Sequence, residues 1–165
     1  MNELIKIVAE YVLVVSVLGI GLLLYRVAPR LRKAIILQLL IGGIITLLLA
    51  KIGSYLYNDP RPFVQGNFVP LFGHSTDNGF PSDHTLLSGL LAFTALYYSR
   101  KIGIGLLLIA IAIGGARMAA GVHHLSDIVG ALIFAALGSL IAKLLLDTYF
   151  AKQSGMFRGS ERRRK

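Results

Sequence analysis

Three residues of this sequence have the types and spacing needed for phosphoryl transfer. His123 and Asp127 are four positions apart, so on a helix they share one face, where the carboxylate can hold one ring nitrogen and leave the other free. A histidine held in this way can attack phosphorus and form a covalent phosphohistidine. His84, in a separate segment, can protonate the leaving oxygen and later deprotonate the attacking water.

Two arginines and a helix start supply the binding site that such a nucleophile needs. Arg61 and Arg117 carry permanently charged planar side chains that suit phosphate oxygens. The pair Pro81-Ser82 is typical of a helix N-terminus, whose free N–H groups and positive dipole end also attract an anion. The carboxylate pairs and cysteines of a two-metal hydrolase are missing from this set. We therefore expect a phosphate pocket that works with no metal and no cofactor.

The elements that position these residues are membrane helices. Of the 165 residues, 55% are hydrophobic and 15% are charged, a balance too apolar for a soluble domain of this length. A bilayer core about 30 Å thick needs about 20 apolar helical residues to cross it. Five runs approach that length, at 4–25, 34–57, 82–98, 102–121 and 125–146. We therefore expect one all-α domain over 1–165, an integral-membrane helical bundle of about five transmembrane helices.

Basic residues predict the orientation of these helices. Most of the 17 lysines and arginines follow the first and fifth runs or separate the third from the fourth, and the basic tail at 148–165 is the largest group. The positive-inside rule assigns these segments to the cytoplasmic side of the membrane. The connections 58–81 and 122–124 then face the periplasm or the exterior. Because no aromatic-interleaved basic platform accompanies the charge, we expect contact with the bilayer and no binding of nucleic acid.

The charged residues fall into three spaced motifs, all at the same predicted membrane face. In chain order they are Arg61-Pro62, then Pro81-Ser82-Asp83-His84, then Arg117-x5-His123-x3-Asp127. In this order they resemble the three signature motifs of the type 2 phosphatidic acid phosphatase superfamily, which has integral-membrane bacterial members. The resemblance covers 51–127. It implies a helical membrane fold and a phosphatase that acts on lipid phosphates.

The resemblance also assigns roles to these residues. It implies that His123 attacks phosphorus, that Asp127 orients it, and that His84 is the acid for the leaving group. It further implies that no metal is required. The phosphate-binding set that it indicates consists of Arg61, Arg117, Ser82 and Asp83.

Three positions depart from the family pattern. The family usually places a lysine seven residues before the motif arginine, where this chain has Ser54, and Lys51 lies three residues earlier. Asp83 stands where glycine is usual, and Ala116 stands where serine usually precedes the arginine. None of these changes removes a catalytic group, but the role of Lys51 as a phosphate ligand is left open.

The loop before the second motif bears on the substrate. With its flanking motifs, this loop resembles the branch of the family that hydrolyses undecaprenyl diphosphate to undecaprenyl phosphate and so recycles a cell-wall lipid carrier. His74, Asp77 and Asn78, together with the displaced Lys51, are placed to contact a second phosphate or a headgroup. Asp and Asn before glycine are also ordinary turn formers, so a purely structural role for the loop is an equal alternative.

Other lipid phosphates and other protein classes are alternatives. The same site suits lipid A 1-phosphate, phosphatidylglycerol phosphate or phosphatidate, or a phosphotransferase that passes the phosphoryl group to another lipid. A different class is a membrane transporter that uses the arginines only to bind phosphate or lipid. The nucleophile, orienter and acid spacing of His123, Asp127 and His84 favours the phosphatase.

Overall fold

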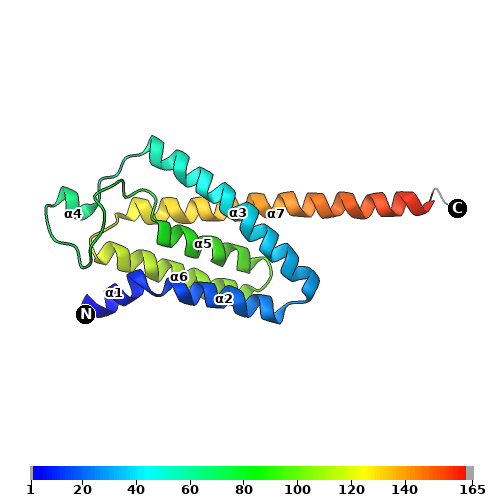
Figure 1. Cartoon of the computed structure of the whole chain (residues 1–165), viewed down its shortest axis with the longest axis horizontal. Helices are drawn as coiled ribbons and strands as arrows, with labels where there is room; N and C mark the ends of the chain where they lie inside the picture. Colours follow the sequence, from blue (N-terminus) through cyan, green and yellow to red (C-terminus); the bar gives the residue numbers. More distant parts are fainter. Residues whose placement is uncertain (1, 163–165) are drawn as a thin grey trace.

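The computed structural model describes residues 2–162, with side chains described for residues 2–151. This part of the chain is helical, with no strand and one isolated bridge between Pro60 and Asn78. In chain order the helices are α1 (Asn2–Glu10), α2 (Leu13–Arg26), α3 (Pro29–Leu56), α4 (Pro62–Gln65), α5 (Asp83–Leu96), α6 (Arg100–Ala119) and α7 (Leu125–Arg162) (Figure 1).

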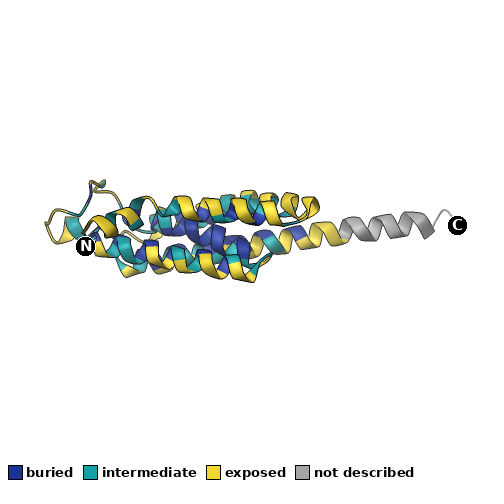
Figure 2. Ribbon diagram, turned by 90° about the horizontal axis from the view of Figure 1, so that it is seen from below, coloured by how far each residue is buried: buried dark blue, intermediate teal, exposed yellow. Residues whose placement is uncertain are grey.

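The helices form one elongated bundle around α5. This helix packs against α2, α3, α6 and α7, and most of its residues are buried. Buried residues run along the interior, whereas exposed residues cover the outside of the bundle (Figure 2). Many of the exposed residues are large and hydrophobic, which suits contact with lipid chains. The prediction of an all-helical membrane protein is therefore confirmed.

The predicted number of five membrane-crossing helices is not confirmed. Among the described residues, α3, α6 and α7 are long and apolar enough to cross a membrane, and the bent pair of α1 and α2 adds a fourth if it counts as one span. α5 has 14 residues, which corresponds to about 21 Å of helix and is shorter than a bilayer core. Five full-length spans are therefore not confirmed, because the third predicted run, 82–98, forms a short helix enclosed by its neighbours.

The first predicted run, 4–25, is broken into two helices. α1 and α2 meet at a bend of 45° around Tyr11 and Val12. Next to the bend, the carbonyl of Ala9 accepts a hydrogen bond from Arg117 Nη1 at 3.2 Å. A straight helix would use that carbonyl in its own hydrogen-bond ladder. The break thus supplies a backbone acceptor to a buried guanidinium at the end of α6.

α7 extends well beyond the fifth predicted run, 125–146. Its backbone continues as a helix to Arg162 and so includes most of the basic segment 148–165. The side chains of residues 152–162, and residues 163–165 altogether, lie outside the described part of the chain. The assignment of this segment as a cytoplasmic tail stays a prediction.

A buried polar network joins α3 to α7 and to the end of α5. Gln38 Nε2 donates to the Ser139 carbonyl at 3.1 Å, and Gln38 Oε1 accepts from the Tyr98 hydroxyl at 2.8 Å. Ser139 Oγ also pairs with Thr94 Oγ1 at 3.1 Å. Gln38, Thr94 and Ser139 are fully buried. In an apolar surrounding, polar groups of this kind hold helices together because their alternative is to go unpaired.

We predict that Gln38→Leu destabilises the protein by about 1 kcal/mol, because the substitution leaves the Tyr98 hydroxyl without its acceptor and Ser139 without its donor. Thermal unfolding of the purified protein in detergent measures the effect. Ile36→Leu, on the exposed side of α3, is the control and should leave the midpoint unchanged. Equal midpoints for Gln38→Leu and the wild type would contradict a stabilising role for the network.

Candidate active site

The candidate nucleophile lies in the short connection between α6 and α7. His123 Nδ1 is 3.1 Å from Asp127 Oδ2, and both residues are buried. His123 precedes the first residue of α7, so the pair forms across the start of the helix and not on a face within it. The backbone of Ser82 donates to the Asp127 carbonyl at 3.2 Å and ties the start of α5 to this turn. The arrangement leaves His123 Nε2 as the free ring nitrogen.

Arg61 faces that free nitrogen. It immediately precedes α4, it is 5% exposed, and its Nη1 donates to the Val122 carbonyl at 3.0 Å. The same Nη1 lies 3.3 Å from His123 Nε2. Because a guanidinium can only donate, Nε2 is the acceptor, and the ring proton then resides on Nδ1, where Asp127 accepts it. This tautomer presents a lone pair on Nε2, as a nucleophile requires.

Arg117 approaches from the last turn of α6. It is 3% exposed, and its Nη1 donates to the carbonyl of Ala9. Its Nη2 lies 2.8 Å from His74 Nε2, and the ring of Phe72 lies 5.7 Å from its central carbon. Its Nε is buried and has no hydrogen-bond partner among the described residues. A buried donor left unpaired is costly, so this N–H is available to an incoming anion.

The start of α5 carries the second motif. Ser82 is fully buried, and its Oγ accepts from Thr85 Oγ1 at 3.2 Å, which leaves its own proton free to donate. His84 is half-buried and lies within electrostatic range of both Arg117 and His123. Asp83 is exposed and lines a pocket whose lining also includes Arg61. The start of α5 therefore places Ser82 and His84 near the candidate nucleophile and Asp83 in the adjoining pocket.

Two residues of the loop between α4 and α5 contact the arginines. Asp77 Oδ1 accepts from Arg61 Nε at 3.0 Å and from Arg61 Nη2 at 2.9 Å. The ring of His74 meets the ring of His123 edge to face, with centroids 5.9 Å apart, and its Nε2 contacts Arg117. Both guanidinium groups thus have a partner from this loop.

The other two residues of the predicted headgroup set lie farther out. Asn78 Oδ1 accepts from the backbone N–H groups of Asp59 and Phe80, and its Nδ2 donates to Ser54 at the end of α3. These bonds occupy the whole amide, which favours the structural role for Asn78. Lys51 is exposed and lines an outer pocket of about 250 Å³.

The surroundings of the site shift three pKa values outside the helices. Burial lowers the pKa of His123, and the charges of Arg117 and Arg61 lower it further, against the opposing effect of the Asp127 hydrogen bond. Burial and the same two arginines lower the pKa of His74. The Ser75 hydroxyl and Arg61 lower the pKa of Asp77. At neutral pH, His123 is therefore uncharged and Asp77 is ionised.

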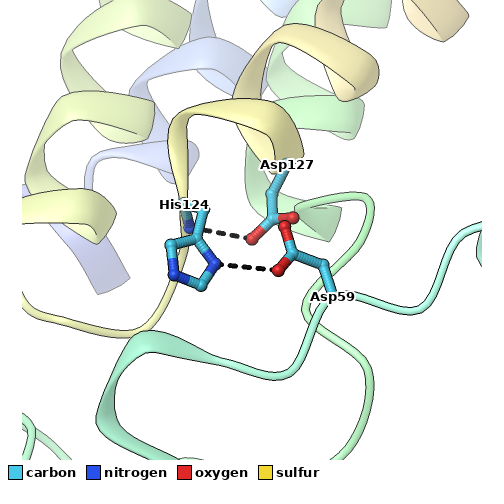
Figure 3. A group of neighbouring side chains, drawn as sticks. All are labelled: Asp59, His124 and Asp127. Carbon is cyan, nitrogen blue, oxygen red and sulfur yellow. Dashed lines mark hydrogen bonds and ion pairs between the residues drawn. The ribbon is translucent and has the colours of Figure 1, made fainter. Parts of the chain in front are cut away.

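Asp59 and His124 are the residues that sequence reasoning missed. Neither residue occupies a named position of the three motifs. In the structure Asp59 Oδ1 lies 3.1 Å from His124 Nδ1, and Asp127 lies beside them (Figure 3). Ligand atoms of these three residues lie within 4.8 Å of one another, so the group has the composition of a metal site. Metal independence therefore stays a prediction. The sequence feature that points to Asp59 and His124 is their closeness to Arg61 and His123 in the chain.

Comparison with known proteins shows the family to which the chain belongs. The family model of the PAP2 superfamily matches residues 33–150. The chain is 29% identical over 142 residues to the bacitracin transport permease protein BcrC of Bacillus licheniformis, covering 85% of this chain and 69% of that protein. It is 35% identical over 95 residues to the undecaprenyl-diphosphatase BcrC of Bacillus subtilis (strain 168), covering 58% of this chain and 49% of that protein.

A solved structure shares the fold. The crystal structure of a transmembrane PAP2-type phosphatidylglycerolphosphate phosphatase from Bacillus subtilis superposes with a TM-score of 0.61 at 22% sequence identity. The superposition covers 89% of this chain and 77% of that one. Because the family model covers well over half of the sequence, the expectation from the three motifs is confirmed: this chain belongs to the PAP2 superfamily and is a membrane phosphatase that acts on lipid phosphates.

Proposed function

We propose that the protein hydrolyses undecaprenyl diphosphate to undecaprenyl phosphate through a phosphohistidine on His123. The observation that carries the proposal is one buried arrangement: His123 held by Asp127 at Nδ1, with Nε2 facing the guanidinium of Arg61. A neutral imidazole with a free Nε2 beside a fixed positive charge is suited to attack a phosphorus atom bound by that charge.

The proposed reaction has two steps. In the first, His123 Nε2 bonds to the terminal phosphorus, the bond to the leaving oxygen breaks, and His84 gives that oxygen a proton. In the second, water attacks the phosphohistidine, His84 takes a proton from the water, and inorganic phosphate leaves. Arg61, Arg117 and Ser82 bind the phosphoryl oxygens and stabilise their charge in both steps.

A lipid substrate is supported by two adjoining cavities beside the site. The outer one, about 250 Å³, is polar and includes Arg61 and Lys51 in its lining. The second, about 490 Å³, is apolar and lies between α3 and α5. Both are lined by Leu47 and Asp83, so the headgroup pocket adjoins a space suited to a hydrocarbon chain. We place this site at the periplasmic or exterior face, with the basic C-terminal segment in the cytoplasm.

The choice among lipids rests on the relatives. The Bacillus subtilis relative is named an undecaprenyl-diphosphatase. Lys51 and Asp77 line the outer pocket, to which we assign the second phosphate, whereas His74 contacts Arg117. Lipid A 1-phosphate, phosphatidylglycerol phosphate and phosphatidate fit the same chemistry, as does transfer of the phosphoryl group to another lipid. The Bacillus licheniformis relative is named a transport permease, which keeps a phosphate-binding or lipid-binding transporter as the alternative from a different class.

We predict that purified protein in detergent releases phosphate from undecaprenyl diphosphate in the presence of EDTA. His123→Ala should lower kcat by at least about 1,000-fold, because no other group replaces the nucleophile. The measurement is phosphate release over a panel of undecaprenyl diphosphate, lipid A, phosphatidylglycerol phosphate and phosphatidate. A faster reaction with another lipid would reassign the substrate. Binding of the lipids without turnover by the wild type would favour the transporter, and loss of activity in EDTA would contradict the metal-free mechanism.

We predict an unusually acidic lower limb in the pH profile of kcat/KM. The attacking form of His123 is neutral, so activity falls as pH drops through its pKa, which burial and the two arginines place below 6.5. Because the Asp127 hydrogen bond raises this pKa, Asp127→Asn should move the limb to still lower pH in addition to reducing the rate. The ionisation of the substrate is the same for both proteins and serves as the internal control. A midpoint above 6.5, or one unmoved in Asp127→Asn, would count against His123 as the titrating group.

We predict that Asp77→Asn lets inorganic phosphate inhibit at about 2- to 5-fold lower concentration, the range expected for removing an exposed ion pair. The carboxylate and phosphate compete for the same Arg61 donors, and Asp77 is 65% exposed in its side chain. Thr76→Ala in the same loop is the control. Weaker inhibition by phosphate in Asp77→Asn would show that Asp77 orients Arg61 for the anion instead of competing with it.

A further inference from the structure

The carboxylate of Asp59 joins the segment that carries Arg61 to the segment that carries the nucleophile. Asp59 Oδ1 lies 3.1 Å from His124 Nδ1, and Asp59 Oδ2 accepts from Ser126 Oγ at 2.7 Å. Figure 3 shows the three side chains Asp59, His124 and Asp127 converging at the start of α7. Asp59 Oδ2 also accepts from the Tyr57 hydroxyl at 3.5 Å. Asp59 is 8% exposed, so its carboxylate is largely shielded from water.

The backbone of Asp59 is fixed as well. Its N–H donates to Asn78 Oδ1 at 2.9 Å, and its carbonyl accepts from the N–H of Gly79 at 2.9 Å. Both backbone groups are therefore bonded to the loop before α5, while the side chain reaches α7. A residue tied at the backbone and at both carboxylate oxygens cannot shift without breaking several hydrogen bonds.

The position of Asp59 matters for Arg61, which lies two residues later in the same segment. Arg61 contacts both the Val122 carbonyl and His123 Nε2. The backbone N–H of His124 donates to Asp127 Oδ2 at 2.9 Å, the same oxygen that holds His123 Nδ1.

Asp127 depends on these contacts for its orientation. Its Oδ1 is buried and has no hydrogen-bond partner among the described residues, so the side chain is held through Oδ2 alone. The backbone N–H of His124 supplies one of the two groups on that oxygen. The ring of His124 lies within ion-pair distance of Asp59, at 3.1 Å, outside hydrogen-bond geometry. A second carboxylate–histidine pair thus lies directly next to the first.

We propose that Asp59, through His124 and Ser126, is a positioning residue that sets His123 Nε2 against Arg61 for in-line attack; the proposal rests on the proposed phosphohistidine reaction. Asp59 contacts neither the phosphoryl group nor His123. Its effect is therefore expected on the transition state and not on the binding of the ground state, because displacing a reacting atom by about 1 Å costs up to about 100-fold in rate.

The test compares Asp59→Asn, His124→Phe and the double variant in full-length protein. We expect each single variant to lower kcat by about 10- to 100-fold with KM within about 2-fold of the wild type. The double variant should be no slower than the slower single variant, because the two residues act as a unit. Asp147→Asn, which breaks an ion pair with Lys143 far along α7, is the matched control and should leave kcat unchanged.

A second readout separates positioning from folding. Orthovanadate adopts the five-coordinate geometry of the transition state, whereas inorganic phosphate resembles the product. Asp59→Asn should weaken vanadate binding by about the factor lost in kcat and leave phosphate binding unchanged. If Asp59→Asn does not fold, Ser126→Ala removes a single hydrogen bond and should show the same split at a loss of about 2- to 10-fold.

Failure of the proposal for Asp59 can be told apart from failure of the proposed function. Unchanged kcat and vanadate affinity in Asp59→Asn, a change in KM alone, or a lower melting temperature with full activity would each overturn the proposal. A wild-type protein that turns over no lipid would refute the proposed function, and vanadate binding measured by vanadium NMR would still decide whether Asp59 positions His123.

Discussion

The structure depends on the burial of two guanidinium groups at one end of a membrane bundle. Arg61 and Arg117 are 5% and 3% exposed, and an arginine does not escape the cost of burial by losing its proton. Each must therefore find partners within the protein. Backbone carbonyls are among these partners: the Val122 carbonyl accepts from Arg61, and the Ala9 carbonyl accepts from Arg117.

The need of both buried arginines for partners explains the break between α1 and α2 and the path of the loop before α5. The break between α1 and α2 places the carbonyl of Ala9 beside Arg117, and the loop before α5 brings His74 to Arg117 and Asp77 to Arg61. The remaining donor, Arg117 Nε, is unpaired within the described residues. Positive charge that the protein neutralises only in part attracts anions such as phosphate, so the burial of the arginines is consistent with the substrate binding proposed for them.

The short central helix α5 also carries residues of the candidate site. α5 packs against α2, α3, α6 and α7, and most of its residues are buried. Its N-terminus carries Ser82 and His84, and the Ser82 N–H bonds to the carbonyl of Asp127. Hydrophobic run length predicted an apolar helix here, but length and composition do not reveal whether a helix meets lipid or protein.

The helical class and the phosphatase family could be predicted from the amino-acid sequence alone. Runs of apolar residues report local periodicity, and the three motifs report residue types, so the sequence predicts the helices and proposes the set His123, Asp127 and Arg61. The groups that contact this set are known only from the folded chain. The contacts of Asp59 with His124 and of Asp77 with Arg61 join residues 65 and 16 positions apart, and such pairings depend on how helices pack and loops return, which no local pattern encodes.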